Sequence, residues 1–475
     1  MATLATAARE HGLEEGELQG LRESMHGEIL TPADFGYDAA RTPWNLAVEP
    51  QPAVVAVVTG EDDVIAAVNF AREQGLGIAV QGAGHGIATA CEGGVLVNMS
   101  RMKGVVVNPV RRTARVKAGA VWSEVIRETQ RFGLAPLSGC SPDVGVAGYT
   151  LGGGTGWLAR RYGYAADSLR AVDIVTAEGW LELASNTSNS DLFWALRGGG
   201  GNFGIVTALE FNLYPVLRVY GGGIFYPMEQ AREVLTLYRE WVRTVPDTIT
   251  SRVAMIQVPP SPFVPSAIRG HWTIAVQACL LGTEAEGEEL LRPLRQVPGP
   301  LLDTFRLMPY TEIGSIANDP KDRRALWAGT EMLNDISPEL IGQLTATVGA
   351  GDSLLRVVEI RQMGGAIAKL AENASAVGHR QAAFRMNAIA ASPNRNDAAA
   401  ATQEIARVCD AARPYAPGGV LLNGLERSSA HPAPSAYSTE NYGRLMAVKR
   451  KYDPGNLFRF SLNIPPSEAS GQGPA

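Results

Sequence analysis

The strongest constraint on the fold is a glycine-rich segment, residues 145–156, which reads Gly-Val-Ala-Gly-Tyr-Thr-Leu-Gly-Gly-Gly-Thr-Gly. A single turn needs one or two glycines, whereas this segment has six. Its backbone must therefore lie directly against something flat or bulky. The excess extends to the whole chain, because 52 of its 475 residues are glycine, about 11% against a usual ~7%.

A second glycine-rich segment, Gly82-Ala83-Gly84-His85-Gly86, follows a strand-like run at residues 78–81. Backbone amides without side chains between them can converge on one anion, and a diphosphate is the natural guest. An ordinary tight turn fits the same residues. If the segment does bind a ligand, His85 projects at that ligand. Because a ring nitrogen of histidine is a nucleophile, a covalent bond to a cofactor is chemically open.

A nicotinamide-binding fingerprint is the competing explanation for these glycines. That fingerprint needs G-x-G-x-x-G directly after the first strand of a βαβ unit, with an acidic residue ~20 positions later. The glycine runs at residues 152–156 and 198–201 both lack this context. We therefore do not expect classical NAD binding.

Hydrophobic patterns change character near residue 215. Before it, a helix is predicted at residues 13–30, and strand-like runs with an amphipathic helix at residues 62–74 form a βαβ opening. Two strands are expected to meet at a turn at Glu178-Gly179, and a further strand is expected at 205–213. Beyond residue 215, apolar strands alternate with helical patterns at residues 228–244, 283–296, 336–348 and 398–413, which predicts an α+β domain with an antiparallel sheet under helices. The expected strands there are 221–226, 249–257, 272–281, 354–360, 382–391 and 420–425. The last fifty residues predict a helix at 440–452 and a strand at 457–464.

Charge and composition exclude several classes of function. The net charge is −6 and no basic run is present, which argues against nucleic acid and anionic membrane as partners. No signal-peptide pattern opens the chain, and no apolar run approaches ~20 residues, so we expect a cytoplasmic protein without a membrane span. The four cysteines show no metal-ligand spacing, and we expect free thiols and no metal site. The oligomeric state is left open.

Several motifs, in their order and spacing, match one family. They lie at residues 80–86, 144–154, 200–206, 440–445, 452–459 and 463–466. On these motifs the chain resembles the berberine-bridge-enzyme-like FAD-linked oxidases, which have the vanillyl-alcohol-oxidase type of FAD-binding fold. The resemblance covers nearly the whole chain. It implies an FAD-binding domain in two parts, residues 1–215 and 426–475, with a substrate-binding domain inserted at residues 216–425.

The resemblance also implies where FAD binds. Residues 82–86 would hold the diphosphate, His85 would be bonded to the 8α-methyl of the flavin, and Tyr149 would lie near the pyrimidine edge. Ile205 and Val206 would flank the dinucleotide, and Asn463 would reach the ribityl chain or ring edge. The expected cofactor-binding residues are Gln81, Gly82, Ala83, Gly84, His85, Gly86, Gly139, Ser141, Val144, Gly145, Gly148, Tyr149, Gly153, Gly154, Ile205, Val206 and Asn463.

A second covalent link is not expected. Many relatives attach the flavin again through a cysteine three residues before the position of Val144. Ser141 occupies that position here, and Cys140 stands one residue too early. Because a one-residue slip in an extended strand reverses the side-chain direction, Cys140 should point away, unless a bulge turns it back.

The catalytic residues of relatives are only partly present. A tyrosine base is replaced by Gly424, and a carboxylate on the strand after residues 379–380 is absent near Met386. Either other residues supply the base, although an ordinary packing role fits each of them, or the substrate needs no base. The candidate catalytic residues are Tyr149, Glu359 and Asn387, with Gln362 as a further one.

The resemblance favours an oxidase. In this family a valine at the position of Val144 leaves dioxygen access to the flavin, whereas a larger aliphatic side chain hinders it. We therefore expect a hydride to be taken from a small organic substrate, a secondary metabolite or a sugar, and electrons to pass to O2. The alternatives are a flavin dehydrogenase with another acceptor, and a flavin-binding protein that no longer turns over.

Overall fold

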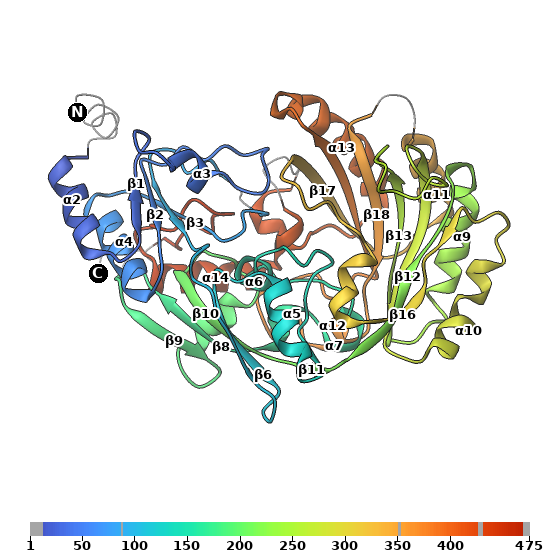
Figure 1. The fold of residues 1–475 in the computed structure, drawn as a ribbon, viewed down its shortest axis with the longest axis horizontal. Coiled ribbons are helices and arrows are strands. Elements are labelled where there is room, and N and C mark those ends of the chain that lie inside the picture. The colour runs from blue at the N-terminus through green and yellow to red at the C-terminus, as the bar shows by residue number, and fades with distance from the viewer. Residues whose placement is uncertain (1–12, 87–88, 350–352, 426–430, 469–475) are drawn as a thin grey trace, which may run out of the picture.

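The computed structural model describes residues 13–86, 89–349, 353–425 and 431–468. Figure 1 shows two lobes: one contains the N-terminal strands together with the C-terminal helix α14 (Thr439–Tyr452), and the other is built on a large sheet. Helix α6 (Val146–Leu151) lies between the lobes, near the centre of the molecule. The glycine-rich segment 145–156 therefore runs through the middle of the fold.

The first lobe has two large sheets, and the short strands β7 (Leu134–Ala135) and β11 (Tyr214–Pro215) form a separate two-stranded sheet. In the four-stranded sheet, β2 and β3 both pair in parallel with β4, and helix α4 (Glu61–Glu73) connects β2 to β3. The five-stranded sheet is antiparallel, and β8 and β9 meet at the predicted turn, where Gly179 has φ +78°. In sheet order the strands are β1 (Glu28–Leu30), β2 (Val54–Val57), β4 (Val95–Asn98) and β3 (Ile78–Gln81), then β5 (Val105–Asn108), β6 (Thr113–Lys117), β10 (Ile205–Asn212), β8 (Leu169–Val175) and β9 (Leu181–Ser185).

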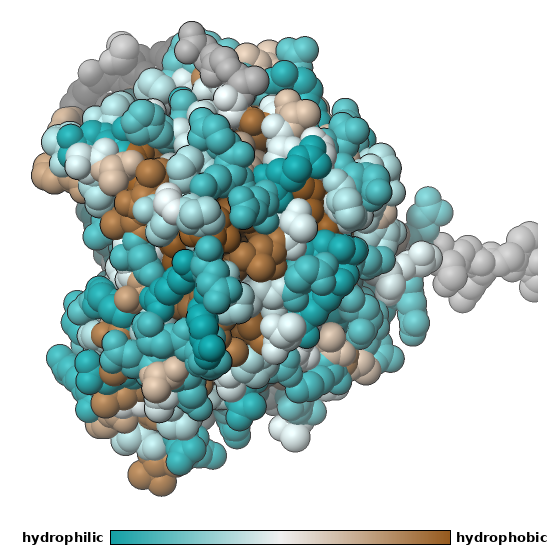
Figure 2. Space-filling model, turned by 90° about the vertical axis from the view of Figure 1, so that its right-hand side faces the viewer, coloured by the Kyte–Doolittle hydropathy of each residue, from teal (hydrophilic) through white to brown (hydrophobic). Residues whose placement is uncertain are grey.

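The second lobe is an eight-stranded antiparallel sheet with helices on its outer face. The helices are α9 (Ala231–Trp241), α10 (Glu284–Arg295), α11 (Pro338–Thr347) and α13 (Ala398–Ala412). The strands in order are β15 (Leu302–Asp303), β12 (Arg218–Pro227), β14 (Trp272–Leu280), β13 (Ile249–Gln257), β18 (Leu355–Gln362), β19 (Phe384–Ser392) and β17 (Ala325–Leu333), and β16 (Arg306–Pro309) pairs with β12. Figure 2 looks onto this side, which is mostly hydrophilic with hydrophobic residues visible in a central band. The predicted α+β class with an inserted antiparallel sheet is confirmed.

Two hydrophobic cores follow this division. One unites the sheets of the first lobe with Leu445, Phe458 and Ile464 from the end of the chain. The other fills the space between the eight-stranded sheet and its helices. The C-terminal residues thus pack with the N-terminal part, which agrees with a domain in two parts. The exact boundaries at residues 215 and 425 stay predictions.

A buried polar cluster anchors the C-terminal part. The Lys449 ammonium donates to a carboxylate oxygen of Asp453 at 2.6 Å and to the carbonyl of Asn202 at 2.7 Å, and the Lys449–Asp453 pair is fully buried. The Asn202 side-chain oxygen accepts from the Ser461 hydroxyl and the Ile464 N–H. Residues 461–464 are thereby fixed against the loop that precedes β10.

Two predicted strands are wrong. Residues 457–464 form no strand, because the N–H groups of Leu457 and Phe458 donate to the Asp453 carboxylate instead of a neighbouring strand. Residues 420–425 contain a 3-10 turn, Leu422–Gly424, closed by a bond from the Gly424 N–H to the Leu421 carbonyl. The helix expected over residues 13–30 ends at Ser24, and the strands β6 and β17 were not predicted.

Removing the buried ammonium should destabilise the protein strongly. We expect Lys449→Met to lower the free energy of unfolding by about 3–5 kcal/mol, because Asp453 would keep a buried charge without its partner. The control is Lys451→Met on the same helix, since Lys451 is exposed and its pair with Asp191 should contribute no more than about 1 kcal/mol. Urea denaturation of both flavin-loaded variants measures the difference, and equal effects would contradict the anchoring role.

Candidate functional site

Strand β3 leads directly into the cradle segment, residues 82–86. Gly84 has φ +77°, in the left-handed region, and a Cβ there would lie 2.7 Å from the Cα of Pro43. The Gly84 carbonyl accepts a hydrogen bond from the Asn45 N–H at 3.1 Å. Glycine is therefore required at position 84, because both the backbone angle and the neighbouring chain exclude a side chain.

Open space borders the cradle segment. A Cβ built on Gly86 or on Gly148 meets no heavy atom within 4 Å, whereas one on Gly145 lies 3.5 Å from the backbone nitrogen of Ala83. The two glycine-rich segments therefore touch at one point and leave room beside it. Gly82 lies next to the same space, since its Cβ would have only the Ala118 carbonyl oxygen within reach, at 3.9 Å.

His85 is held as a neutral ring within the cradle segment. Its imidazole stacks on Trp44 with ring centroids 4.3 Å apart. Burial lowers the pKa of His85 from 6.5 to about 4, although Asp143 acts in the opposite direction through its charge and a backbone hydrogen bond. The ring nitrogen Nε2 is buried and has no partner. A neutral imidazole with a free nitrogen is the form in which histidine is nucleophilic.

Two other predicted residues also present unsatisfied polar atoms. The side-chain oxygens of Gln81, at the end of β3, and of Asn463, in the C-terminal segment, are buried without a hydrogen-bond partner. The C-terminal segment lies beside β3, where the Leu457 carbonyl accepts the Ile78 N–H. Buried polar atoms are rarely left unpaired, so these atoms together with His85 Nε2 indicate a polar ligand.

Other predicted glycines pack against protein side chains. A Cβ on Gly139 would lie 2.9 Å from the ring of Tyr149, and one on Gly154 would lie 2.5 Å from it. A Cβ on Gly153 would be 3.4 Å from Val377. Gly139 and Gly154 therefore make room for the Tyr149 ring, and their assignment to FAD stays a prediction.

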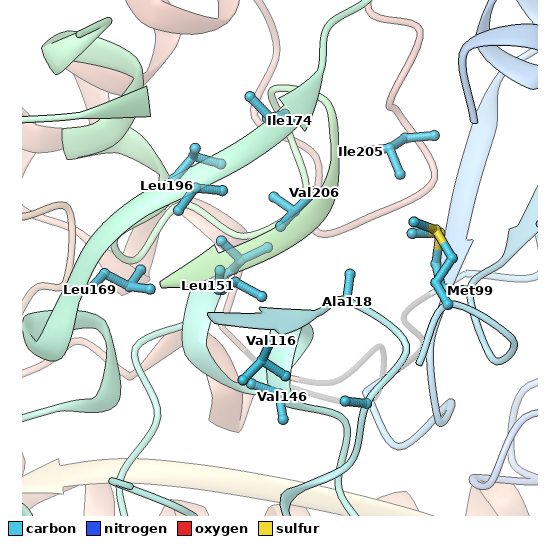
Figure 3. Close-up of a cluster of buried hydrophobic side chains, with 14 of the residues drawn as sticks. Met99, Val116, Ala118, Val146, Leu151, Leu169, Ile174, Leu196, Ile205 and Val206 are labelled. Carbon is cyan, nitrogen blue, oxygen red and sulfur yellow. The ribbon is translucent and has the colours of Figure 1, made fainter. Parts of the chain in front are cut away.

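Ile205 and Val206 lie in the hydrophobic core. Figure 3 shows them on β10 among Ala118 of the neighbouring segment, Leu151 of α6 and Ile174 of β8. Their exposed fractions are 0% and 5%. The side chains thus stabilise the sheet beneath the glycine-rich segments, and any contact with a dinucleotide would come from the backbone.

The segment that holds Cys140 and Ser141 is not a strand. It is a bend followed by a turn, so the alternation used to predict the direction of Cys140 does not apply. The Cys140 sulfur accepts a hydrogen bond from the Arg361 guanidinium at 3.0 Å. Cys140 therefore faces the eight-stranded sheet, and Val144 and Gly145 follow it towards the cradle segment.

The sheet presents a polar face to this segment. Arg252 on β13, Arg361 on β18 and Arg385 on β19 are paired in register across three neighbouring strands. The Glu359 carboxylate lies among them: it is hydrogen-bonded to Arg252 and lies 3.7 Å from Arg361 and 3.8 Å from Arg385. Asn387, which pairs with Glu359 across the strands, donates to it at 2.7 Å. We call Arg252, Glu359, Arg361, Arg385 and Asn387 the arginine row.

The predicted catalytic residues fall into three places. Glu359 and Asn387 belong to the arginine row, whereas Tyr149 lies on α6 and Gln362 points to the helical side of the sheet. Gln362 accepts from Ser251 and donates to the Val242 carbonyl, so its hydrogen bonds are complete. A packing role suffices for Gln362.

The titration behaviour of these groups limits their chemistry. Burial opposes ionisation of Glu359, but Arg252, Arg361 and Arg385 together hold its pKa well below the usual range, so it is a carboxylate and a weak base. Burial raises the pKa of Tyr149 far above 10, so its phenol keeps its proton. These directions favour charge positioning by Glu359 and hydrogen-bond donation by Tyr149 over proton abstraction.

The sequence contained a signal for the arginine row that was not used. Glu359-Ile360-Arg361 and Arg385-Met386-Asn387 each place two polar side chains two residues apart within an apolar strand, which directs both to one face. Asp319, on the loop after the 3-10 helix Tyr310–Ser315, was also missed. Its carboxylate is exposed and acts on Arg252 and Arg361 through its charge.

Comparisons with known proteins agree with this geometry. Two family models match, one described as an FAD binding domain over residues 52–184 and one as berberine and berberine like over residues 428–465. The chain is 30% identical to (R)-6-hydroxynicotine oxidase of Paenarthrobacter nicotinovorans, over 93% of this chain and 97% of that protein. It is 28% identical to an FAD-linked oxidoreductase of Dictyostelium discoideum, over 94% and 96%. The solved structure of BBE-like 1 from Physcomitrella patens has a TM-score of 0.85 at 24% identity, with 95% and 100% covered.

The fold and the site thus define a flavin-dependent oxidoreductase. The chain belongs to the berberine-bridge-enzyme-like FAD-linked oxidoreductases, as its motifs predicted, and its cofactor is FAD. The residues present fit this cofactor, because open space borders Gly86 and Gly148, and His85 and Asn463 carry buried atoms without partners. Within the described ranges, no helix is long and apolar enough to cross a membrane, and no group of three potential metal ligands occurs.

Two glycine substitutions should distinguish a glycine required by the backbone turn from a glycine that borders the cofactor space. We expect Gly84→Ala to cost about 1–3 kcal/mol of stability and to reduce flavin content, because the backbone is left-handed and the methyl group meets Pro43. Gly86→Ala should leave the stability of the flavin-free protein within about 0.5 kcal/mol but lower its flavin content, since its methyl group enters the open space. The ratio of flavin to protein absorbance and urea denaturation measure both. Full flavin loading of Gly86→Ala would contradict this location of the cofactor.

Proposed function

We propose that this enzyme is an oxidase, which removes a hydride from a carbon of a small organic substrate and delivers the electrons to O2. The observation that supports it most is the contact between Cys140 and Arg361, which brings the polar face of the sheet up to the glycine-rich segments. A substrate bound at this face would lie next to the cofactor. When bound, FAD supplies the hydride acceptor, and the protein supplies orientation, electrostatics and the exclusion of water.

The two lobes would divide the work. In the first, the cradle segment, Gly148 and Asn463 would hold the cofactor, with His85 bonded to the 8α-methyl. In the second, the arginine row would orient the substrate. Tyr149 would donate a hydrogen bond, since its buried hydroxyl has no partner and keeps its proton.

The substrate class is drawn from the relative and from the site. (R)-6-hydroxynicotine oxidase is named for a small nitrogen heterocycle, and it is 30% identical to this chain. A small secondary metabolite is therefore our first candidate and a sugar the second. Glu359 is a poor candidate to accept a proton, because the three arginines hold its pKa well below the usual range.

Anaerobic mixing of the purified yellow protein with candidate substrates tests the function, with (R)-6-hydroxynicotine and simple sugars as the first set. Bleaching of the flavin absorbance followed by recovery in air supports an oxidase. Bleaching without recovery in air would show a dehydrogenase with another acceptor. No bleaching with a wide substrate set would favour a flavin-binding protein that does not turn over.

The proposed function predicts that the flavin is attached covalently through His85. Acid precipitation of the wild type should leave the yellow colour with the protein, and a tryptic peptide containing His85 should carry the flavin mass. His85→Ala should still bind FAD through the backbone amides, more weakly and with slower turnover. Cys140→Ala is the matched control and should leave flavin content and absorbance nearly unchanged. Intact FAD in the supernatant of the wild type would overturn the proposal.

The access of oxygen to the flavin gives a further prediction. Val144 directly precedes Gly145, which approaches the cradle segment at Ala83. Val144→Leu adds one methylene there at a cost of about 1–3 kcal/mol, which the fold should tolerate. Reduction of the flavin by substrate should stay near wild type, while reoxidation by air slows sharply and an artificial dye acceptor still works. Stopped-flow measurement of reoxidation decides the question, and equal rates with O2 would remove Val144 as the gate.

A further inference from the structure

We propose that the substrate carries a carboxylate and that Arg361 and Arg385 bind it. This inference rests on the proposed function, because it concerns the same site and names the chemical class of the molecule oxidised there. It is carried by three features of the arginine row: its charge balance, its unpaired N–H groups and its register on the sheet.

The charge of the arginine row is not balanced. Three guanidinium groups share the single buried carboxylate of Glu359, so these four groups together carry a formal charge of +2. Arg252, Arg361 and Arg385 retain only 8%, 2% and 11% of their side-chain exposure. Buried charge that lacks a partner is strongly unfavourable, so a second anion is expected at this place.

The donors left over identify where that anion binds. The Nε and Nη1 atoms of Arg361 and the Nε atom of Arg385 are buried without a hydrogen-bond partner. Arg252 differs, because its Nε donates to Gln277 at 2.8 Å and its Nη1 to Glu359. The free donors therefore lie on the Arg361 and Arg385 side of the row. Planar guanidinium groups with several N–H donors match the geometry of carboxylate oxygens.

The register of the sheet shows that the arrangement is costly to the fold. Arg361 pairs directly with Arg252 on one neighbouring strand and with Arg385 on the other. Like charges directly opposite each other destabilise a sheet. The repulsion among these three arginines destabilises the free protein. A negatively charged ligand that offsets the repulsion is therefore the best explanation for the row.

The surroundings hold the guanidinium groups in position. The ring of Trp157 lies 5.0 Å from the Arg361 guanidinium and 5.7 Å from that of Arg252. Cys140 accepts from the remaining terminal nitrogen of Arg361. Glu359 repels an anion most strongly beside Arg252, to which it is hydrogen-bonded, whereas Arg361 and Arg385 lie 3.7 Å and 3.8 Å from it.

Binding of matched neutral and anionic probes to the flavin-loaded enzyme tests this inference without turnover. The pairs are benzoate with benzamide, 3-phenylpropionate with 3-phenylpropanamide, and glucuronate with glucose. Dissociation constants come from the change in flavin absorbance, or from calorimetry where the spectrum does not change. We expect the anion of at least one pair to bind about tenfold or more tightly than its neutral partner. No preference in any pair would overturn the proposal.

Variants then show which arginines cause the tighter binding of the anionic probe. Arg361→Gln and Arg385→Gln should each bring the ratio of the two dissociation constants close to one, and Arg361→Lys should keep part of it. Arg160→Gln is the matched control, because Arg160 is equally buried but donates to the carbonyls of Met363 and Ile249 elsewhere. If Arg361→Gln changes the reduction potential of the flavin but leaves the ratio intact, the row serves the reduced flavin and the proposal is wrong.

Failure of the proposed function has a different signature. If the enzyme prefers the anionic probe but no carboxylate or other substrate bleaches the flavin, the anion site stands and the oxidation is refuted. If substrates bleach the flavin but no probe pair shows a preference, the oxidation stands and the carboxylate site is refuted.

Discussion

The close approach of two backbone segments is the constraint on which the rest of the structure depends. The cradle segment and the glycine-rich segment 145–156 touch at Ala83 and Gly145, where a side chain on the glycine would fill the contact. This approach leaves open space beside Gly86 and Gly148, and it places His85 at the edge of that space. The hydrophobic core beneath it, which includes Ile205 and Val206, keeps the strands in place (Figure 3). The site for the cofactor is thus made mainly by backbone.

Electrostatics governs the opposite side of the site. The arginine row lies on rigid strands and keeps Glu359 ionised, so this face is a fixed positive surface and not a source of a strong base. The hydrogen bond between Cys140 and Arg361 connects this surface to the first lobe. In the proposed function, orientation of the substrate and placement of the cofactor would depend on the same small region between the lobes.

Particular elements show how far sequence reasoning extends. The helices α4, α9, α13 and α14 and most strands of the large sheet were predicted, because each has a clear hydrophobic period. The prediction of a strand at residues 457–464 was wrong, because side chains accept hydrogen bonds from its backbone N–H groups. The buried Asp453 accepts from Leu457, and Asn202, far away in the sequence, accepts from Ile464. The direction of Cys140 stays a prediction without a strand argument behind it, because the segment bends and a bend has no alternation from which to infer a face.

The sequence by itself determined the family, the cofactor and the segments that hold it, because motifs such as residues 80–86 and 144–154 are local and their glycines have a direct backbone meaning. It also supplied Glu359 and Asn387 as single residues. Only the tertiary structure decided that these two join Arg252, Arg361 and Arg385, since the residues lie on three strands far apart in the chain and meet through strand register. Register follows from the packing of the whole sheet against its helices, and no local pattern contains that information.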